Sequence, residues 1–189
     1  ISHFTDEKMS RLRRQKIGFV FQFYNLIPNL NVEENILLPL LLDGKKAADY
    51  QDRLAQLLET VGLSDRRRHT PRELSGGQRQ RAYIAMVIAQ DTEYILLDEP
   101  TNNLDIYHAS NMMKMVRKLS DELGKTVNLV LHEINYAAFY SDYICAFKNG
   151  KIAKYGTVEE VIQKEVLSEI YQVDFEILNI KGKPLSVYY

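Results

Sequence analysis

Two short motifs in this chain combine residue types that could do chemistry on a phosphate. The first, Leu74–Gln78, reads Leu-Ser-Gly-Gly-Gln and opens a helical stretch. It therefore offers an anion the unpaired backbone N–H groups of a helix start, together with a hydroxyl and an amide. Its two glycines would let the backbone approach a phosphate closely. The candidate phosphate-binding residues are Ser75, Gly76, Gly77 and Gln78.

The second motif lies twenty residues later, where the apolar run Tyr94–Leu97 is followed by Asp98 and Glu99. The first carboxylate could bind Mg²⁺ through water, and the second could polarise an attacking water as a general base. Ligands of α/β proteins bind at the carboxyl ends of the strands, which is where these acids would lie. Either motif alone also fits ordinary structure, a glycine turn before a helix or two surface acids. The ordered pair is highly specific.

The elements that must position the first motif are mostly helical. The sequence predicts a short charged helix over residues 6–16, a buried strand over 17–22 and an amphipathic helix over 47–61. Asn31 followed by Glu34 is typical of a helix N-cap, and Gly62 closes the amphipathic helix. Residues 23–73 are therefore predicted to form a helical insertion between two strand-associated motifs.

From Gly76 onward, helices and strands alternate. We expect helices over 78–90 and 110–123, strands over 94–98 and 127–131, and hairpins over 142–155 and 175–189. Thr157 and Glu160 indicate one further helix start with a capping box. Near-continuous apolar strands separated by helices predict an α/β fold with a mainly parallel sheet covered on both faces.

Bulk composition is that of an ordinary globular domain, with 46% apolar and 26% charged residues among 189. The formal net charge of -1 argues against nucleic-acid binding by bulk electrostatics, so no nucleic-acid partner is expected. No apolar run approaches the length of about 18 residues that a membrane-spanning helix needs. The single cysteine, Cys145, lies in an apolar strand-like run and is expected to be buried and inert.

Together, the two motifs resemble the signature and Walker B motifs of ABC transporter ATPase subunits. The resemblance covers nearly the whole chain and implies a P-loop NTPase-like core sheet with an inserted ABC helical subdomain. The implied divisions are a core strand and Q-loop over 1–22, the helical subdomain with the signature over 23–85, and an α/β core over 86–189. That last part would hold the Walker B motif, the D-loop, the switch histidine and the C-terminal hairpins.

Three further residues gain a role only through this resemblance. Gln22, at the end of an apolar strand, is similar to the Q-loop glutamine, which reaches the metal and the attacking water. Asp105 falls in a D-loop, which faces the opposite subunit in the family, and is expected to contribute to cofactor binding. His132 matches the switch histidine that bonds the γ-phosphate. Without the resemblance, a strand-terminal glutamine and a structural histidine would be the better interpretations.

The resemblance also implies cofactors, partners and location. ATP and Mg²⁺ are the expected cofactors. A second ABC ATPase subunit, arranged head-to-tail, and an integral-membrane permease are the expected partners. The chain is expected to lie peripherally on the cytoplasmic face of the membrane, where it would couple ATP binding and hydrolysis to transport.

One family feature is missing from the sequence. A P-loop reads Gly-x-x-x-x-Gly-Lys-Ser/Thr, and the nearest match, Gly124-Lys125-Thr126, has Leu119 where the first glycine belongs. Only twenty-one residues precede Gln22, which is too few for a P-loop and an N-terminal β-subdomain, so both are expected to be absent. The alternative function is therefore a non-catalytic fragment or chimeric scaffold with no ATP turnover of its own.

The two ends of the chain resemble different members of the family. Residues 1 to about 80 are similar to the lipoprotein-release and macrolide-export type, and residues from about 80 to 189 are similar to iron-siderophore importers. The later part suggests iron-siderophore uptake as the transport function. We hold as a hypothesis that the chain is a chimera joined near Gln78–Arg81.

Overall fold

The computed structural model describes residues 5, 9–10, 16–20, 26–102 and 104–189. Most of the helix predicted over 6–16 lies outside these residues, and so does Gln22. The chain separates into two compact units, Ile1–Val130 and Leu131–Tyr189, and each is described by itself. The three-part division into 1–22, 23–85 and 86–189 stays a prediction.

A three-stranded parallel sheet forms the centre of the first unit. Its strands, in spatial order, are β1 (Ile17–Val20), β2 (Tyr94–Asp98) and β3 (Thr126–Val130). Gly18 lies opposite Ile95, which in turn lies opposite Val127, so the three strands run in register. The predicted parallel sheet is thereby confirmed.

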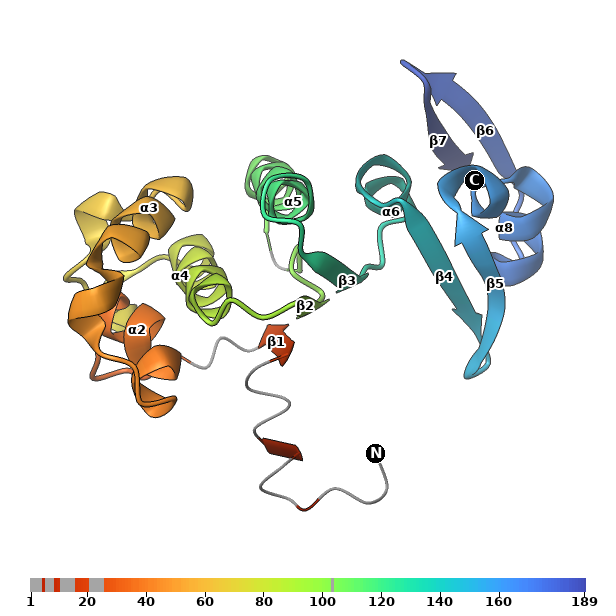
Figure 1. The fold of residues 1–189 in the computed structure, drawn as a ribbon. Helices are drawn as coiled ribbons and strands as arrows, with labels where there is room; N and C mark the ends of the chain where they lie inside the picture. The colour runs from red at the N-terminus through yellow and green to blue at the C-terminus, as the bar shows by residue number, and fades with distance from the viewer. Residues whose placement is uncertain (1–4, 6–8, 11–15, 21–25, 103) are drawn as a thin grey trace. The chain divides into compact units, whose positions relative to one another are not determined.

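Two helices, α4 (Gly76–Ala89) and α5 (Ile106–Asp121), lie on the same side of this sheet (Figure 1). Ile95 and Leu97 of β2 point into the core beneath them and are 2% and 1% exposed. On the opposite face, Tyr94 and Val130 are exposed, at 41% and 52%. The sequence predicted that helices cover both faces of the sheet. Within the described part of the chain, this prediction is correct for one face and wrong for the other. Side chains alternate between the faces of a strand, so only every second position is buried.

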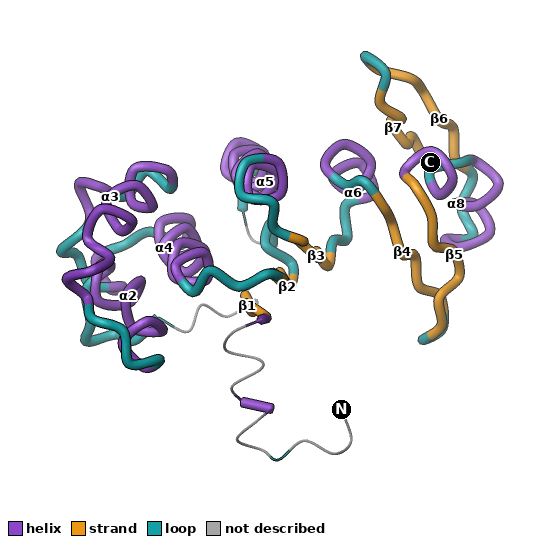
Figure 2. Tube along the Cα trace, in the orientation of Figure 1, coloured by secondary structure: helices purple, strands orange, loops and turns teal. Residues whose placement is uncertain are grey.

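The helical segment of the first unit comprises five helices before α4. They are α2 (Val32–Leu42), η1 (Ala47–Tyr50), α3 (Gln51–Thr60), η2 (Ser64–Arg66) and η3 (Pro71–Glu73), as the described residues show (Figure 2). Asn31 caps α2, and its side chain accepts a hydrogen bond from the Glu34 N–H, which confirms the predicted capping box. The amphipathic helix predicted over 47–61 begins with a 3-10 turn and ends at Thr60, two residues before Gly62, whose φ is +64°.

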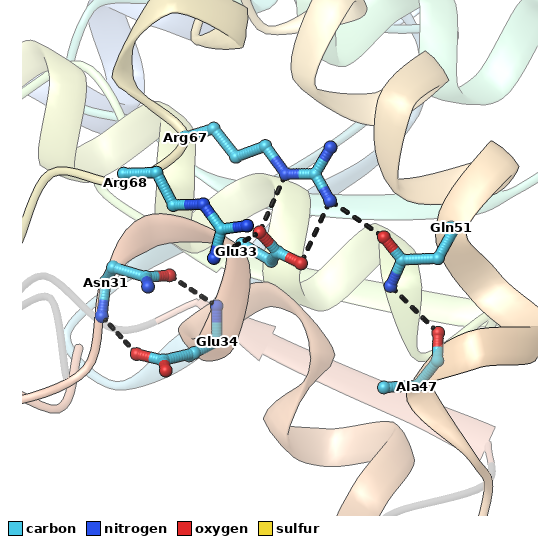
Figure 3. A network of polar contacts seen from close by, with 7 residues as sticks. All are labelled: Asn31, Glu33, Glu34, Ala47, Gln51, Arg67 and Arg68. Carbon is cyan, nitrogen blue, oxygen red and sulfur yellow. Dashed lines mark hydrogen bonds and ion pairs between the residues drawn. The ribbon is translucent and has the colours of Figure 1, made fainter.

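A charged network ties this helical segment together (Figure 3). The Arg67 guanidinium donates to both carboxylate oxygens of Glu33 at 2.7 and 2.9 Å, and also to the Gln51 side-chain oxygen at 2.7 Å. Arg68 approaches the same carboxylate at 3.4 Å. The Arg67 hydrogen bonds hold the pKa of Glu33 below its ordinary value, although partial burial opposes that shift. The network thus links α2, α3 and the segment that leads to α4.

A fully buried amide fixes the chain that enters α2. Asn35 is 0% exposed, and its side-chain oxygen accepts the Ile27 N–H at 2.7 Å. Its amide nitrogen donates to the carbonyls of Ile27, Leu30 and Asn31. Because each of these backbone groups is satisfied by one side chain, the loop from Ile27 to Asn31 is held against the helix.

The second unit consists of two antiparallel hairpins with short helices. Its elements are α6 (Ile134–Tyr140), β4 (Tyr143–Lys148), β5 (Lys151–Thr157), α7 (Val158–Val161), α8 (Lys164–Tyr171), β6 (Phe175–Ile180) and β7 (Lys183–Tyr188). Both hairpins turn where the sequence predicts, at Asn149-Gly150 and Lys181-Gly182, and all four turn residues have positive φ. The capping box of Thr157 and Glu160 is also confirmed.

Cys145 is a correction to the sequence interpretation. It is exposed, not buried, because the alternation along β4 places it on the same face as Tyr143 and Phe147, which are 62% and 64% exposed.

Among the described residues, no helix is both long and apolar enough to cross a membrane.

Candidate phosphate and magnesium site

The start of α4 is held by a reciprocal capping box. The Ser75 N–H donates to Gln78 Oε1 at 2.9 Å, and the Gln78 N–H donates to Ser75 Oγ at 3.3 Å. The box uses one acceptor atom of each side chain. The Ser75 hydroxyl proton and the Gln78 amide N–H groups, which are donors, take no part in it. The arrangement therefore keeps donors for an anion while it fixes the positions of both side chains.

Gly76 and Gly77 form the first helical positions after this cap. Their N–H groups have no acceptor within the helix, because the first turn of any α-helix leaves its donors unpaired. Neither glycine has a positive φ, and a methyl group added to either would meet nothing within 4 Å. The described residues therefore give no reason for glycine at these positions. A partner outside these residues that approaches the backbone closely, as a phosphate does, would supply one.

The two candidate carboxylates follow one another at the end of β2. Asp98 is the last strand residue and is exposed, and Glu99 comes directly after it. The Glu99 N–H donates to the Val130 carbonyl at 3.1 Å, which extends the pairing with β3. Glu99 has a φ of +48°, a left-handed conformation that non-glycine residues adopt at a cost of roughly 1 kcal/mol or more. The backbone therefore turns sharply at the proposed general base.

Asn102 holds the Glu99 side chain. Its amide nitrogen donates to Glu99 Oε2 at 2.9 Å, and its backbone N–H donates to the Glu99 carbonyl at 3.1 Å. The sequence analysis assigned Asn102 no role at the candidate site. Nothing in the residue pattern indicates this contact, because it depends on the turn that Glu99 makes.

The donor chemistry at the end of β2 fits a magnesium ion. Mg²⁺ keeps several waters and takes one or two carboxylates together with substrate phosphates, so it needs no cage of protein ligands. The described residues contain no cluster of three His, Cys, Asp or Glu that could form such a cage. The exposed carboxylate of Asp98 is suited to this kind of site.

Asp105 is the N-cap of α5. Its side chain accepts the His108 N–H at 2.8 Å, so one of its oxygens serves the helix start. The next two residues, Ile106 and Tyr107, are 85% and 72% exposed. Exposed large apolar side chains beside a predicted D-loop are consistent with a protein partner there.

The remaining predicted residues are not brought to this site by the described geometry. Gln22 lies outside the described residues. His132 is exposed and follows β3, but it belongs to the second unit, so its position beside Glu99 stays a prediction. The first unit thus contains the capped α4 start and the Asp98–Glu99 pair.

Comparisons with known proteins identify relatives of this chain. A sequence profile of the ABC transporter family matches residues 2–102. The petrobactin import ATP-binding protein YclP of Bacillus subtilis is 52% identical over 134 residues, which are 71% of this chain and 53% of that protein. The lipoprotein-releasing system ATP-binding protein LolD of Alcanivorax borkumensis is 39% identical over 138 residues, 73% of this chain and 60% of LolD.

A solved structure agrees with these relatives. The dimeric ATP-binding cassette MJ0796 of Methanocaldococcus jannaschii, in a post-hydrolysis state with ADP and Pi, matches with a TM-score of 0.73 and 36% identity. The match covers 82% of this chain and 68% of that one. This chain spans between 53% and 60% of the length of the two curated relatives named above.

Proposed function

Because this chain belongs to the ABC transporter family, we propose that it is the nucleotide-binding subunit of an ABC transporter, which couples ATP binding and hydrolysis to transport. One observation carries the proposal. The start of α4 displays unpaired donors and two glycines that the described chain itself does not require. The Asp98–Glu99 pair lies in the same compact unit.

Each residue has a part in the proposed mechanism. Asp98 would hold Mg²⁺, and that ion would neutralise charge on the phosphates. The Glu99 carboxylate accepts a proton from the attacking water, and Asn102 keeps that carboxylate in one orientation. Gln22 and His132 would complete the grip on the water and the γ-phosphate, as the family resemblance implies.

The start of α4 would act on a nucleotide held by a second subunit. Ser75, Gly76, Gly77 and Gln78 present donors outward, which suits a head-to-tail dimer in which each signature completes the other subunit's phosphate site. Asp105, with the exposed Ile106 and Tyr107 after it, would lie against that second subunit. The dimeric state of the MJ0796 cassette supports this arrangement.

The relatives support a proposal for the membrane partner and for the cargo. We propose an integral-membrane permease as the second partner and a peripheral location on the cytoplasmic face of the membrane. The similarity to a petrobactin importer supports iron-siderophore uptake. Since LolD is also a relative, separate comparisons of residues 1–75 and 85–189 would test the chimera hypothesis, which fails if both return one subfamily.

A second candidate function is a scaffold without turnover. It concerns the 189 residues taken by themselves, which contain no P-loop motif. Gly124-Lys125-Thr126 cannot serve as one, since α5 precedes it and β3 begins at Thr126, whereas a P-loop needs a strand before it and a helix after it. Gly124 has a φ of +61° and acts as the turn after the helix.

The mass of the intact gene product in solution, measured by light scattering with and without MgATP, separates the two candidates. The transporter subunit is expected to change from monomer to dimer when MgATP is added, while AMP leaves its mass unchanged. A mass that stays monomeric at saturating MgATP contradicts the proposed subunit function and favours the scaffold.

A further inference from the structure

A buried glutamine connects α4 to the chain beside Glu99. Gln80 lies one turn into α4 and is 1% exposed. Its amide nitrogen donates a hydrogen bond to the carbonyl of Pro100, twenty residues further along the chain. The Gln80 side-chain oxygen has no partner among the described residues. The bond to Pro100 is therefore the polar contact that accounts for an amide at this buried position.

Pro100 follows Glu99 directly, so whatever holds its carbonyl also constrains Glu99. Proline has no N–H group, so its carbonyl is the one backbone polar group that Pro100 itself offers as an anchor. Gln80 bonds to that carbonyl from the core side, since both residues are buried. The anchor therefore comes from a rigid helix and not from the loop itself.

The backbone at Glu99 needs such support. Its φ of +48° is disfavoured for a residue with a side chain, and conformations of this kind persist only where their surroundings fix them. The Glu99 N–H is held by the Val130 carbonyl, and the Glu99 carbonyl accepts the Asn102 N–H. Gln80 adds the third restraint, at the peptide that follows Pro100, one residue beyond Glu99.

We propose that Gln80 is a positioning residue for Glu99: it fixes the Pro100 carbonyl, and so holds the left-handed turn that aims the Glu99 carboxylate at the attacking water. The inference rests on the proposed function in assigning Glu99 as the general base. Gln80 itself touches no substrate. Gln80 affects only how the proton acceptor is oriented. Loss of that orientation should lower the rate of the chemical step and leave nucleotide affinity unchanged.

The test replaces Gln80 with methionine in the intact gene product. Methionine is similar in length, flexible and apolar, so Gln80→Met fills the same buried space and removes the donor to Pro100 together with the unpartnered side-chain oxygen. We expect kcat for MgATP hydrolysis to fall about 10- to 100-fold, the size of effect that a small misplacement of a catalytic group produces, with KM unchanged within about twofold. Gln90→Met, the same change at the other end of α4, is the matched control and should keep the wild-type kcat.

A second readout does not depend on turnover. If Gln80 holds the turn, hydrogen exchange at the Glu99 and Asn102 amides should become about tenfold faster in Gln80→Met and stay unchanged in Gln90→Met. Wild-type exchange and kcat in Gln80→Met would overturn the inference. So would a reduced kcat accompanied by an equal rise in KM, because that would indicate lost binding and not lost positioning.

The Glu99→Gln background separates the inference from the proposed function. If Glu99 is the base and Gln80 acts through it, adding Gln80→Met to Glu99→Gln should lower the residual turnover no further. A further 10-fold loss would contradict the positioning role. Turnover retained in Glu99→Gln alone would instead refute the proposed role of Glu99, whatever Gln80 does.

Discussion

Replacing Gly77 with alanine should change stability and nucleotide response in opposite directions. Gly77 lies in the first turn of α4, its φ is not positive, and an added methyl group meets nothing within 4 Å. Alanine is favoured over glycine within a helix by about 0.5–1 kcal/mol. Since the first turn is less demanding than the helix interior, we expect Gly77→Ala to raise the free energy of unfolding by about 0.5 kcal/mol.

The same methyl group should obstruct a phosphate. An N–H group donates to an oxyanion at about 2.7–3.1 Å, so an added methyl on the backbone beside it intrudes on the approaching oxygens. We expect the MgATP concentration needed to form half of the dimer to rise at least about tenfold, which corresponds to about 1.4 kcal/mol.

The assay pairs thermal unfolding with light scattering of the intact gene product during a MgATP titration. A gain of about 0.5 kcal/mol in a chain of this size is expected to raise the unfolding temperature by about 1–2 °C. Gly124→Ala is the matched control, because Gly124 has a φ of +61° and lies after α5. That control should unfold at a lower temperature and keep its MgATP response. The reasoning is wrong if Gly77→Ala unfolds earlier than wild type, or dimerises at the same MgATP concentration.

Three further predictions concern the folding stability of the first unit. Glu33→Gln should cost about 2 kcal/mol of folding stability at pH 7, because it breaks the ion pair with Arg67. Arg67 lowers the pKa of Glu33 below its ordinary value of 4.5. The stability that the ion pair contributes is therefore present above pH 4.5 and is lost as the pH falls through the lowered pKa. Equal urea stabilities of Glu33→Gln and wild type at pH 7 would contradict the prediction. Asn35→Leu should cost about 2–4 kcal/mol in urea unfolding, since it leaves four part-buried hydrogen bonds to the backbone unmade; a cost below about 1 kcal/mol would disprove the Asn35 anchor. Gly18→Ala should cost about 1–3 kcal/mol, because its methyl group would lie 2.4 Å from Val87 Cγ1; wild-type thermal stability would show that α4 does not pack this closely on β1.

Local rules accounted for much of the fold. The capping boxes at Asn31 and Thr157 and the turn at Asn149-Gly150 were predictable because each depends on residues three or fewer apart. The strand over Tyr94–Asp98 has the predicted bounds, since a short apolar run between a loop and two acids leaves little freedom.

Features that depend on distant parts of the chain were not predictable. Cys145 was expected inside because its neighbours are apolar, yet a two-stranded hairpin buries one face at most and Cys145 lies on the other. The bond from Gln80 to Pro100 joins residues twenty apart, and no spacing rule links them. Helix α5 begins at Ile106, four residues before the predicted start, because the Asp105 cap was interpreted only as part of a loop.

The candidate site was predictable in its residue types but not in its restraints. Glycines and acids at these spacings indicated phosphate and magnesium chemistry from the sequence alone. The left-handed turn at Glu99 is held by Asn102, three residues later, and by the Val130 carbonyl, whose approach depends on the folded sheet. The types of the candidate groups can therefore be identified from short stretches of sequence, whereas their orientation also depends on contacts between distant parts of the fold.

Phosphate release by a Glu99→Gln variant of the intact gene product most directly tests whether Glu99 is the general base of an ABC ATPase. The variant keeps the shape of the side chain and the oxygen that accepts from Asn102, but it removes the proton acceptor. We predict that MgATP hydrolysis falls at least about 100-fold while MgATP still drives dimer formation. Turnover within about twofold of wild type would contradict the account, since another group would then activate the water.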